Sequence, residues 1–390
     1  MRVPYRIFAE GIVIEPEAIK QMEDACSLDV SVRGAMCPDA HSGFGLPIGG
    51  VLATRNAIIP YAVGCDIACR MSLTVFDYPV KAIKGEVKRL IKIIEDNTVF
   101  GVGAATGTQY DHAVMEEDWS FSEITEKLKA NAWSQLGTSG SGNHFCEFGT
   151  LTLEQDELGL KAGVYFALLT HGGSRNTGLK IAEHYTKMAQ RNHQNDLPKY
   201  LLNLAWLDMD HEAGQEYWAA MNLMGRYAAA NHEIIHDRIR RALKTKVLLH
   251  VENHHNFAWK ETLDGEEVIV HRKGATPAHL GTLGVVPGSM ATPGYIVRGK
   301  GNAESINSCS HGAGRAMSRK KTKEGTTWNA AKKFLAEKEV VLISAGLDEV
   351  PFGYKDIEKV MAAQKELVDI VARFDPRIVK MAGLKGDDGE

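Results

Sequence analysis

Apolar residues recur every three or four positions in four segments of the chain, which is the spacing of one face of a helix. In the first of these segments Ile19, Met22 and Cys26 share a face, and Pro16 stands near the first turn, where proline is tolerated. The same spacing predicts helices over residues 15–28, 80–96, roughly 210–243 and 355–374.

Between these helices lie short runs rich in β-branched and aromatic residues, which predict strands. The predicted strands are residues 71–76, 162–170, 245–252, 266–272 and 339–344. They do not alternate strictly with the helices, so a doubly wound parallel sheet is not favoured. We found no internal repeat and no obvious linker, and therefore expect a compact α+β domain.

Composition and charge limit the partners of the protein. A formal net charge of −4 predicts no general affinity for polyanions, so any contact with nucleic acid must come from local basic clusters such as 238–246 and 314–323. A charge run is more often a solvated helix face. The N-terminal MRVPYRIFAEG has charges where a signal peptide needs an apolar stretch, and the apolar run at 162–170 is too short to span a bilayer. We expect a cytoplasmic protein with reduced cysteines and no membrane association.

Residues 308–319, SCSHGAGRAMSR, place His311 among small residues with cations close behind. The glycines after His311 would let a ligand approach the backbone, and Ser308 or Ser310 could cap a helix that starts there. Such a helix N-terminus would suit a phosphate. On these residues alone, an incidental histidine at a helix start is the more ordinary interpretation.

Five residues of metal-binding type stand at predicted strand ends. Asp66 and Cys69 are close enough to face one ion, although their spacing is not that of a zinc knuckle. His144, His171 and His255 each come at a junction between a strand and a loop. Taken singly, each has a structural alternative, such as a buried cysteine or a hydrogen-bonded core histidine. Together, the mixed nitrogen, sulfur and oxygen donors suit one or two divalent cations, and they do not name the metal.

Several loops could bind an anion or a nucleotide. The glycine-serine loop in 136–149 could form a nest for phosphate, but it lacks the lysine and hydroxyl residue of a P-loop. Arg175 follows His171 by four residues, which fits an anion beside a metal. The polar loops at 271–278 and 285–294 could hold a base or a sugar.

Many motifs in one order resemble the RtcB family of RNA-splicing ligases. They are PDAHSGFG, VGCDIAC, GSGNHFCE, HGGSR, HHNFAWKE, HRKGA, PGSM, GNAESINSCSHGAGRAMSR and YKDIEKVMAAQKELVDIV, and they extend over residues 38–371. The resemblance covers nearly the whole chain. It implies one α+β domain over residues 1–390, with mixed β-sheets, flanking helices and a central cleft for metal and nucleotide.

The resemblance also implies an activity and assigns roles. The enzyme would use GTP to join RNA 3′-phosphate or 2′,3′-cyclic phosphate ends to 5′-hydroxyl ends, in tRNA splicing or RNA repair. His311 would carry GMP as a phosphoramidate, Arg175 would contact the RNA, and an archease-like activator is a candidate partner. Two Mn²⁺ ions would sit on Asp66, Cys69, His144, His171 and His255. Nucleotide contacts would be Asn143, Glu147, Asn256, Pro287, Gly288, Ser289, Met290, Gly294, Gly312, Ala313, Gly314, Tyr354 and Lys380.

The chain departs from the family pattern at several positions. Phe44 stands where the family usually has lysine, Gly294 where it has serine, and Arg70 where a glycine follows the metal cysteine. The family ends on a Lys-Gly pair that contacts the nucleotide. Lys380 fits that role by its spacing from the predicted helix, while Lys385 copies the dipeptide, and we prefer Lys380. These departures suggest a divergent, repair-type paralogue.

Three other functions fit the same residues. A dinuclear phosphodiesterase would use the metal ligands to activate water on a cyclic phosphate end. A capping enzyme would transfer GMP to a 3′-phosphate without joining the strands. An RNA-binding scaffold descended from a ligase would keep the fold without catalysis.

Overall fold

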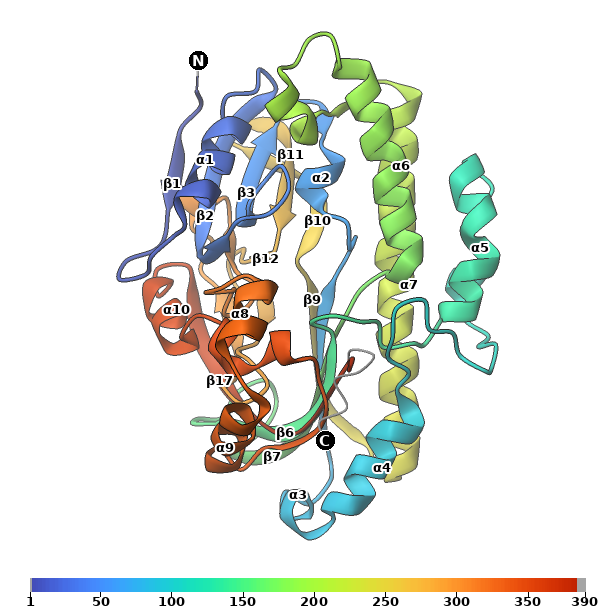
Figure 1. The fold of residues 1–390 in the computed structure, drawn as a ribbon, viewed down its shortest axis with the longest axis vertical. Coiled ribbons are helices and arrows are strands. Elements are labelled where there is room, and N and C mark those ends of the chain that lie inside the picture. The colour runs from blue at the N-terminus through green and yellow to red at the C-terminus, as the bar shows by residue number, and fades with distance from the viewer. Residues whose placement is uncertain (1, 384–390) are drawn as a thin grey trace.

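A computed structural model gives the fold of the chain and describes residues 2–383 (Figure 1). Its largest element is an eight-stranded sheet, whose strands are antiparallel except for β16, which pairs with β17 in parallel. In spatial order these strands are β13 (Leu283–Val286), β14 (Gly294–Gly299), β17 (Val368–Met381), β6 (Phe145–Leu153), β7 (Gly163–Gly172), β5 (Arg70–Phe76) and β9 (Val247–His254), with β16 (Val341–Ser344) beside β17.

A second, five-stranded sheet meets the first where β9 passes into β10. Its order is β1 (Tyr5–Ile7), β2 (Ser31–His41), β3 (Ile48–Thr54), β11 (Glu266–Lys273) and β10 (Asn256–Leu263). Only His255 separates β9 from β10, so this residue lies at the junction of the two sheets. Two small pairs complete the strands: β4 (Ala57–Ile58) with β8 (Leu207–Asp208), and β12 (Ala275–Pro277) with β15 (Ser308–Ser310).

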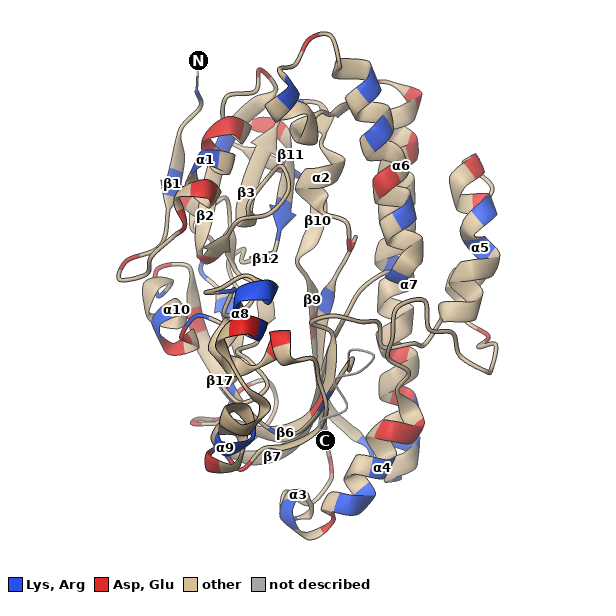
Figure 2. Ribbon diagram, viewed as in Figure 1, with Lys and Arg blue, Asp and Glu red and all other residues tan. Residues whose placement is uncertain are grey.

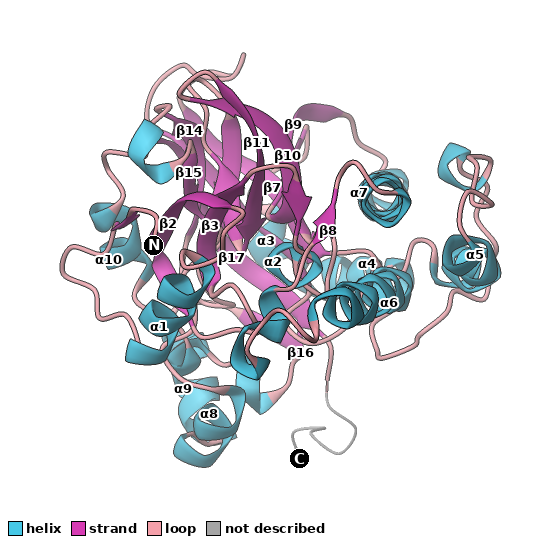
Figure 3. Cartoon of the chain, turned by 90° about the horizontal axis from the view of Figure 1, so that it is seen from above, coloured by secondary structure: helices cyan, strands magenta, loops and turns pink. Residues whose placement is uncertain are grey.

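Helices cover the sheets, and the two longest run side by side (Figures 1 and 3). The helices are α1 (Pro16–Ala25), α2 (Pro60–Val63), α3 (Ala82–Gly85), α4 (Val87–Asn97), α5 (Glu123–Gln135), α6 (Arg175–His193), α7 (Glu212–Leu243), α8 (Arg319–Gly325), α9 (Trp328–Glu337) and α10 (Ile357–Ala363). Along α7 the buried Tyr217, Met221, Met224 and Ala228 recur at helical spacing. Burying one methionine side chain stabilises the fold by roughly 2 kcal/mol, so packing holds this helix in place.

The structure confirms the α+β fold and most predicted elements. Each of the five predicted strands is present, and the predicted helices near the N-terminus and at α7 form. The segment 80–96 is divided at Glu86 into α3 and α4. No helix in residues 2–383 is both long and apolar enough to cross a membrane. The extent of the domain, residues 1–390, stays a prediction.

Two predictions of helix were wrong. The segment 355–374 contains only the short α10, and the chain continues from Val368 as the long strand β17. β17 is hydrogen-bonded to β14 and β6 on its two sides, and this pairing overrides the helical spacing of its apolar residues. The stretch 308–310 is strand β15, and the next helix, α8, starts only at Arg319 with Ser318 as its cap.

Candidate active site

The five predicted metal ligands lie at the ends of neighbouring strands. Asp66 and Cys69 come just before β5. His144 comes just before β6, His171 lies at the end of β7, and His255 joins β9 to β10. Strand register keeps these ends in line, because His171 is paired with the first residue of β6 and the second of β5. The sheet therefore brings together residues that are far apart in the sequence.

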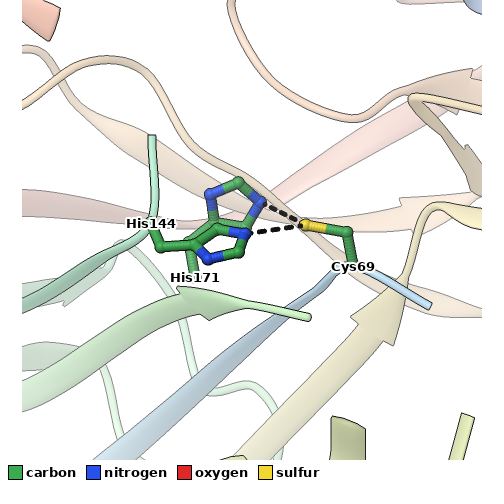
Figure 4. Close-up of side chains that lie close together, drawn as sticks. All are labelled: Cys69, His144 and His171. Carbon is green, nitrogen blue, oxygen red and sulfur yellow. Dashed lines mark hydrogen bonds between the residues drawn. The ribbon is translucent and has the colours of Figure 1, made fainter. Parts of the chain in front are cut away.

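Their donor atoms converge on one small volume. The Cys69 Sγ lies 3.1 Å from Nε2 of His171 and 3.6 Å from Nε2 of His144, and both rings point toward the sulfur (Figure 4). Nε2 of His144 is also 2.9 Å from a carboxylate oxygen of Asp66. Nε2 of His171 lies 3.3 Å from Nε2 of His255. The structure thus brings all five predicted ligands into one cluster.

The protonation of this cluster fits a divalent cation. Nδ1 of His171 lies 3.1 Å from the carbonyl oxygen of Asn143, and because a carbonyl only accepts, Nδ1 carries the hydrogen and Nε2 offers a lone pair. Burial lowers the pKa of His171 to about 3 and that of His255 well below its usual value, so both rings are neutral at pH 7. Burial raises the pKa of the Cys69 thiol, so a bound cation would have to displace its proton.

His311 is held by the buried carboxylate of Asp39, for which the sequence predicted no role of its own. Its Nδ1 lies 2.6 Å from Oδ2 of Asp39, and the same oxygen accepts the backbone N–H of His311 at 3.0 Å. Asp39 is fully buried, and burial alone would raise the pKa of its carboxyl. The charge of His311 and its hydrogen bond to the carboxylate outweigh this effect, so the pKa lies below its usual value. An ionised Asp39 fixes the hydrogen on Nδ1 and leaves the lone pair of His311 on Nε2.

A cavity of about 480 Å³ opens around His311 and the metal-type cluster. Most of the predicted nucleotide contacts line it: Asn143, Glu147, Asn256, Pro287, Gly288, Ser289, Met290, Gly312, Ala313, Gly314 and Tyr354. Glu147 is almost fully buried, and burial raises the pKa of its carboxyl well above the usual range. The volume and the mixed lining are those of a site for a nucleotide-sized ligand.

Two predicted nucleotide contacts do not reach this cavity. Gly294 lies on β14 behind the wall, where an added Cβ would stand 3.3 Å from the backbone of Pro287. Val379 and Met381 line the cavity, whereas Lys380 between them points to the other face of β17, with its ammonium 5.8 Å from the centre of the Phe100 ring. The alternative, Lys385, lies outside the described residues.

An ion-pair network forms one wall of the cavity, and its two carboxylates, Asp348 and Glu349, have no role predicted from the sequence. Arg319 pairs with Asp348 at 2.6 Å and with the buried Glu349. Glu349 also accepts a hydrogen bond from the hydroxyl of Tyr354 and lies 3.4 Å from Arg315. Arg315 and Arg319 lie in the SCSHGAGRAMSR stretch and Tyr354 is a predicted nucleotide contact, whereas Asp348 and Glu349 lie outside the quoted motifs. Only the fold reveals that these two carboxylates lie beside them.

A second cavity, of about 420 Å³, lies on the other side of the metal-type cluster. It is lined by Arg175 and His144, and it shares Asp66 and Asn143 with the first cavity. The Arg175 guanidinium is anchored by Thr138, through Nε at 3.1 Å and through Nη2, while its Nη1 is buried without a hydrogen-bond partner. A buried donor without a partner indicates a place for an anion.

The amino-acid sequence is similar to a protein-family model and to several known proteins along most of its length. A family model described as tRNA-splicing ligase RtcB matches residues 21–123 and 108–382. This chain belongs to the RtcB family. The RNA-splicing ligase RtcB of Escherichia coli K12 is 32% identical, over 94% of this chain and 95% of that protein. The tRNA-splicing ligase RtcB of Nanoarchaeum equitans is 30% identical, over 99% of this chain and 96% of its own length.

RtcB membership confirms the family that the motifs indicated. The RNA-splicing ligase RtcB of Mycobacterium bovis, 29% identical over 94% of this chain and all of its own length, extends the same likeness. The individual roles of the site residues, the metal, the archease-like partner and the cytoplasmic location stay predictions.

Proposed function

We propose that this protein is a GTP- and Mn²⁺-dependent RNA ligase that joins 3′-phosphate or 2′,3′-cyclic phosphate ends to 5′-hydroxyl ends. One observation carries the proposal. A histidine oriented by the buried carboxylate of Asp39 lines a nucleotide-sized cavity, with its ring centre 4.9 Å from that of His255 in the metal-type cluster.

His311 would act as the nucleophile. Asp39 keeps the hydrogen on Nδ1, so Nε2 can attack the α-phosphorus of GTP. A P–N bond forms, the bond to the β-phosphate oxygen breaks, and pyrophosphate leaves. The developing imidazolium is stabilised by the carboxylate of Asp39, as in other pairs of histidine and carboxylate.

The metal-type cluster would hold the cations. Asp66, Cys69, His144, His171 and His255 would bind two Mn²⁺ ions, which when bound supply positive charge beside the reacting phosphates. Soft and borderline donors also bind zinc, so the choice of manganese comes from the resemblance to RtcB ligases.

The RNA end would enter from the side of the second cavity. Arg175 has a buried nitrogen free to bind a phosphate oxygen there. An oxygen of the RNA 3′-phosphate displaces His311 from GMP, breaking the P–N bond and forming a diphosphate. The 5′-hydroxyl oxygen then attacks the RNA phosphorus, GMP leaves, and the hydroxyl proton goes to solvent. Exposed Lys320, Lys321 and Lys323 on α8 would attract the RNA backbone (Figure 2).

Covalent labelling tests the proposal. Incubation with α-labelled GTP and Mn²⁺ should label the protein through an acid-labile bond, and His311→Ala should abolish the label. The assay should be repeated with each NTP and each of Mn²⁺, Zn²⁺, Co²⁺ and Fe²⁺. Failure to label with any nucleotide and any metal would contradict the proposal.

Gel analysis of the RNA separates ligation from the alternatives. With a 3′-phosphate and a 5′-hydroxyl strand, a ligase gives a joined product, whereas a capping enzyme stops at the 3′-strand carrying GMP. A phosphodiesterase opens a cyclic end without GTP. A scaffold binds RNA equally well after EDTA treatment and in His311→Ala.

A further inference from the structure

Phe44 is an exposed aromatic residue in the wall of the His311 cavity. The residue is 70% exposed, although phenylalanine is one of the residues most often buried. Within residues 2–383 its ring has no aromatic or cationic partner. The ring is therefore open to solvent at the edge of the cavity, within reach of a ligand bound there.

The backbone around this ring is held from both sides. The side-chain amide of Gln21 donates to the carbonyl of Gly43 at 2.6 Å and accepts the N–H of Gly43 at 3.0 Å. The ammonium of Lys273 donates to the carbonyl of Phe44 itself. Gly45 has φ +71°, and an added Cβ there would lie 2.6 Å from the Asn203 carbonyl oxygen. The ring is therefore presented on a fixed loop.

The contacts of Phe44 place it on a part of the cavity wall that extends toward the second cavity. It is tied to Lys273, which together with Gly64 and Cys65 lines the same part of the wall. Cys65 also lines the second cavity, where Arg175 lies. Most of the other predicted nucleotide contacts form a second group, in which the Pro287 loop meets Gly312 and Tyr354 meets Glu349. Asn256 lies between the two groups, beside Gly64 and bonded to the N–H of Gly274.

We propose that Phe44 stacks against the base of the 3′-terminal nucleotide of the RNA strand that carries the 3′-phosphate. The inference rests on the proposed ligase function. A solvent-exposed ring on a fixed loop, beside a cavity that would bind phosphate, is the arrangement with which proteins hold single-stranded nucleic acid, and stacking tolerates any base. Phe44 is thereby a positioning residue for the RNA end, and it does not contact the guanine of GTP.

A double-mutant cycle that combines a substitution of Phe44 with removal of the 3′-terminal base of the RNA tests the stacking. Phe44→Ala should lower kcat/KM for ligation of a normal 3′-phosphate strand by about 10- to 100-fold, the usual value of one base–aromatic stack. An RNA strand whose 3′-terminal nucleotide lacks its base should lose a similar factor with the wild-type protein. With Phe44→Ala, removing the base should cost nothing more. Phe44→Trp should stay within about threefold of wild type, whereas Phe44→Leu should behave as alanine.

Controls separate this proposal from the proposed function. Labelling of His311 by GTP should be unchanged in every Phe44 variant, and Leu280→Ala, an 83% exposed residue outside both cavities, should ligate normally. Equal losses by Phe44→Ala on normal and base-less RNA, or no loss on either, would overturn the stacking. So would a raised KM for GTP in Phe44→Ala. Absence of labelling in the wild-type protein would instead defeat the ligase function itself.

Discussion

Two buried histidines, His271 in the five-stranded sheet and His171 in the metal-type cluster, differ in what their ring nitrogens contact. In the five-stranded sheet, Nε2 of His271 accepts the backbone N–H of Ile59 at 2.9 Å, and its Nδ1 donates to a carbonyl at 3.2 Å. In the cluster, only Nδ1 of His171 has such a partner, Asn143, and its Nε2 points at Cys69 Sγ. Both residues are buried, so the nitrogen without a backbone partner is what distinguishes a candidate metal ligand from a structural histidine.

Two arginines show the same contrast. Arg272 is fully buried and every nitrogen of its guanidinium has a partner, including Ser308 at 2.8 Å and Glu261 at 2.6 Å. Arg175 is anchored by Thr138, yet its Nη1 has none. A fully paired buried cation stabilises the fold, whereas a spare donor beside a cavity is available to a ligand.

The strongest test of this contrast is to remove one histidine of each kind. His171→Ala should abolish metal binding and reduce guanylylation of His311 by more than about 100-fold, because the ligand set is broken. His271→Gln should keep the metal content of the wild-type protein. Elemental analysis after dialysis against Mn²⁺ and the labelling assay measure both. If the two variants kept equal metal, the distinction drawn from unfilled nitrogens would be wrong.

Asp39 tests whether orientation of the nucleophile matters as much as its presence. Asp39→Asn keeps the size but removes the negative charge that fixes the hydrogen on Nδ1 of His311. We expect guanylylation to slow by about 10- to 100-fold with little change in KM for GTP, because the residue acts through His311. Stopped labelling reactions at several GTP concentrations give both constants. A change confined to KM would show that Asp39 serves nucleotide binding instead.

The sequence predicted the metal-type cluster better than the surroundings of His311. The five metal-type residues could be found because each stands at a strand end beside small residues, and strand ends converge in a sheet. Asp39 could not be found in this way, because it reaches His311 from 272 positions away along the chain. Only packing of β2 beside β15 makes that pair.

Lys380 shows how an error in one element passes to the site. Its role was inferred from its spacing after a helix over 355–374, but this region is the strand β17. Because side chains alternate along a strand, Val379 and Met381 face the cavity and Lys380 faces away. The apolar residues of β17 fit both spacings, and its neighbours β6 and β14 decided between them.

Conservative changes in the two arginines should give opposite results. Arg175→Lys keeps the charge but loses the fork that binds Thr138 and a phosphate together, so we expect ligation to fall by about tenfold while labelling of His311 continues.

Arg272→Lys should lower the free energy of unfolding by a few kcal/mol, on the order of a lost buried network, with kcat/KM for ligation nearly unchanged. Urea unfolding and gel-based ligation assays distinguish them. A ligation defect in Arg272→Lys without unfolding would erase the contrast.

Protonation of His271 should have the smallest effect on activity, but it should have a clear effect on the free energy of unfolding. Burial lowers its pKa to about 4, below the ordinary 6.5, so the unfolded chain binds the proton first as pH falls. Its contribution to stability is present above pH 6.5 and is lost as pH falls through 4, by about 2 kcal/mol between pH 7 and 5 at roughly 1.4 kcal/mol per pH unit. His271→Gln has no such proton to bind. The free energy of unfolding, measured in urea with EDTA, should therefore fall less for His271→Gln than for wild type between pH 7 and 5. If the two plots of unfolding free energy against pH ran parallel, the paired nitrogen would not be what keeps this ring neutral.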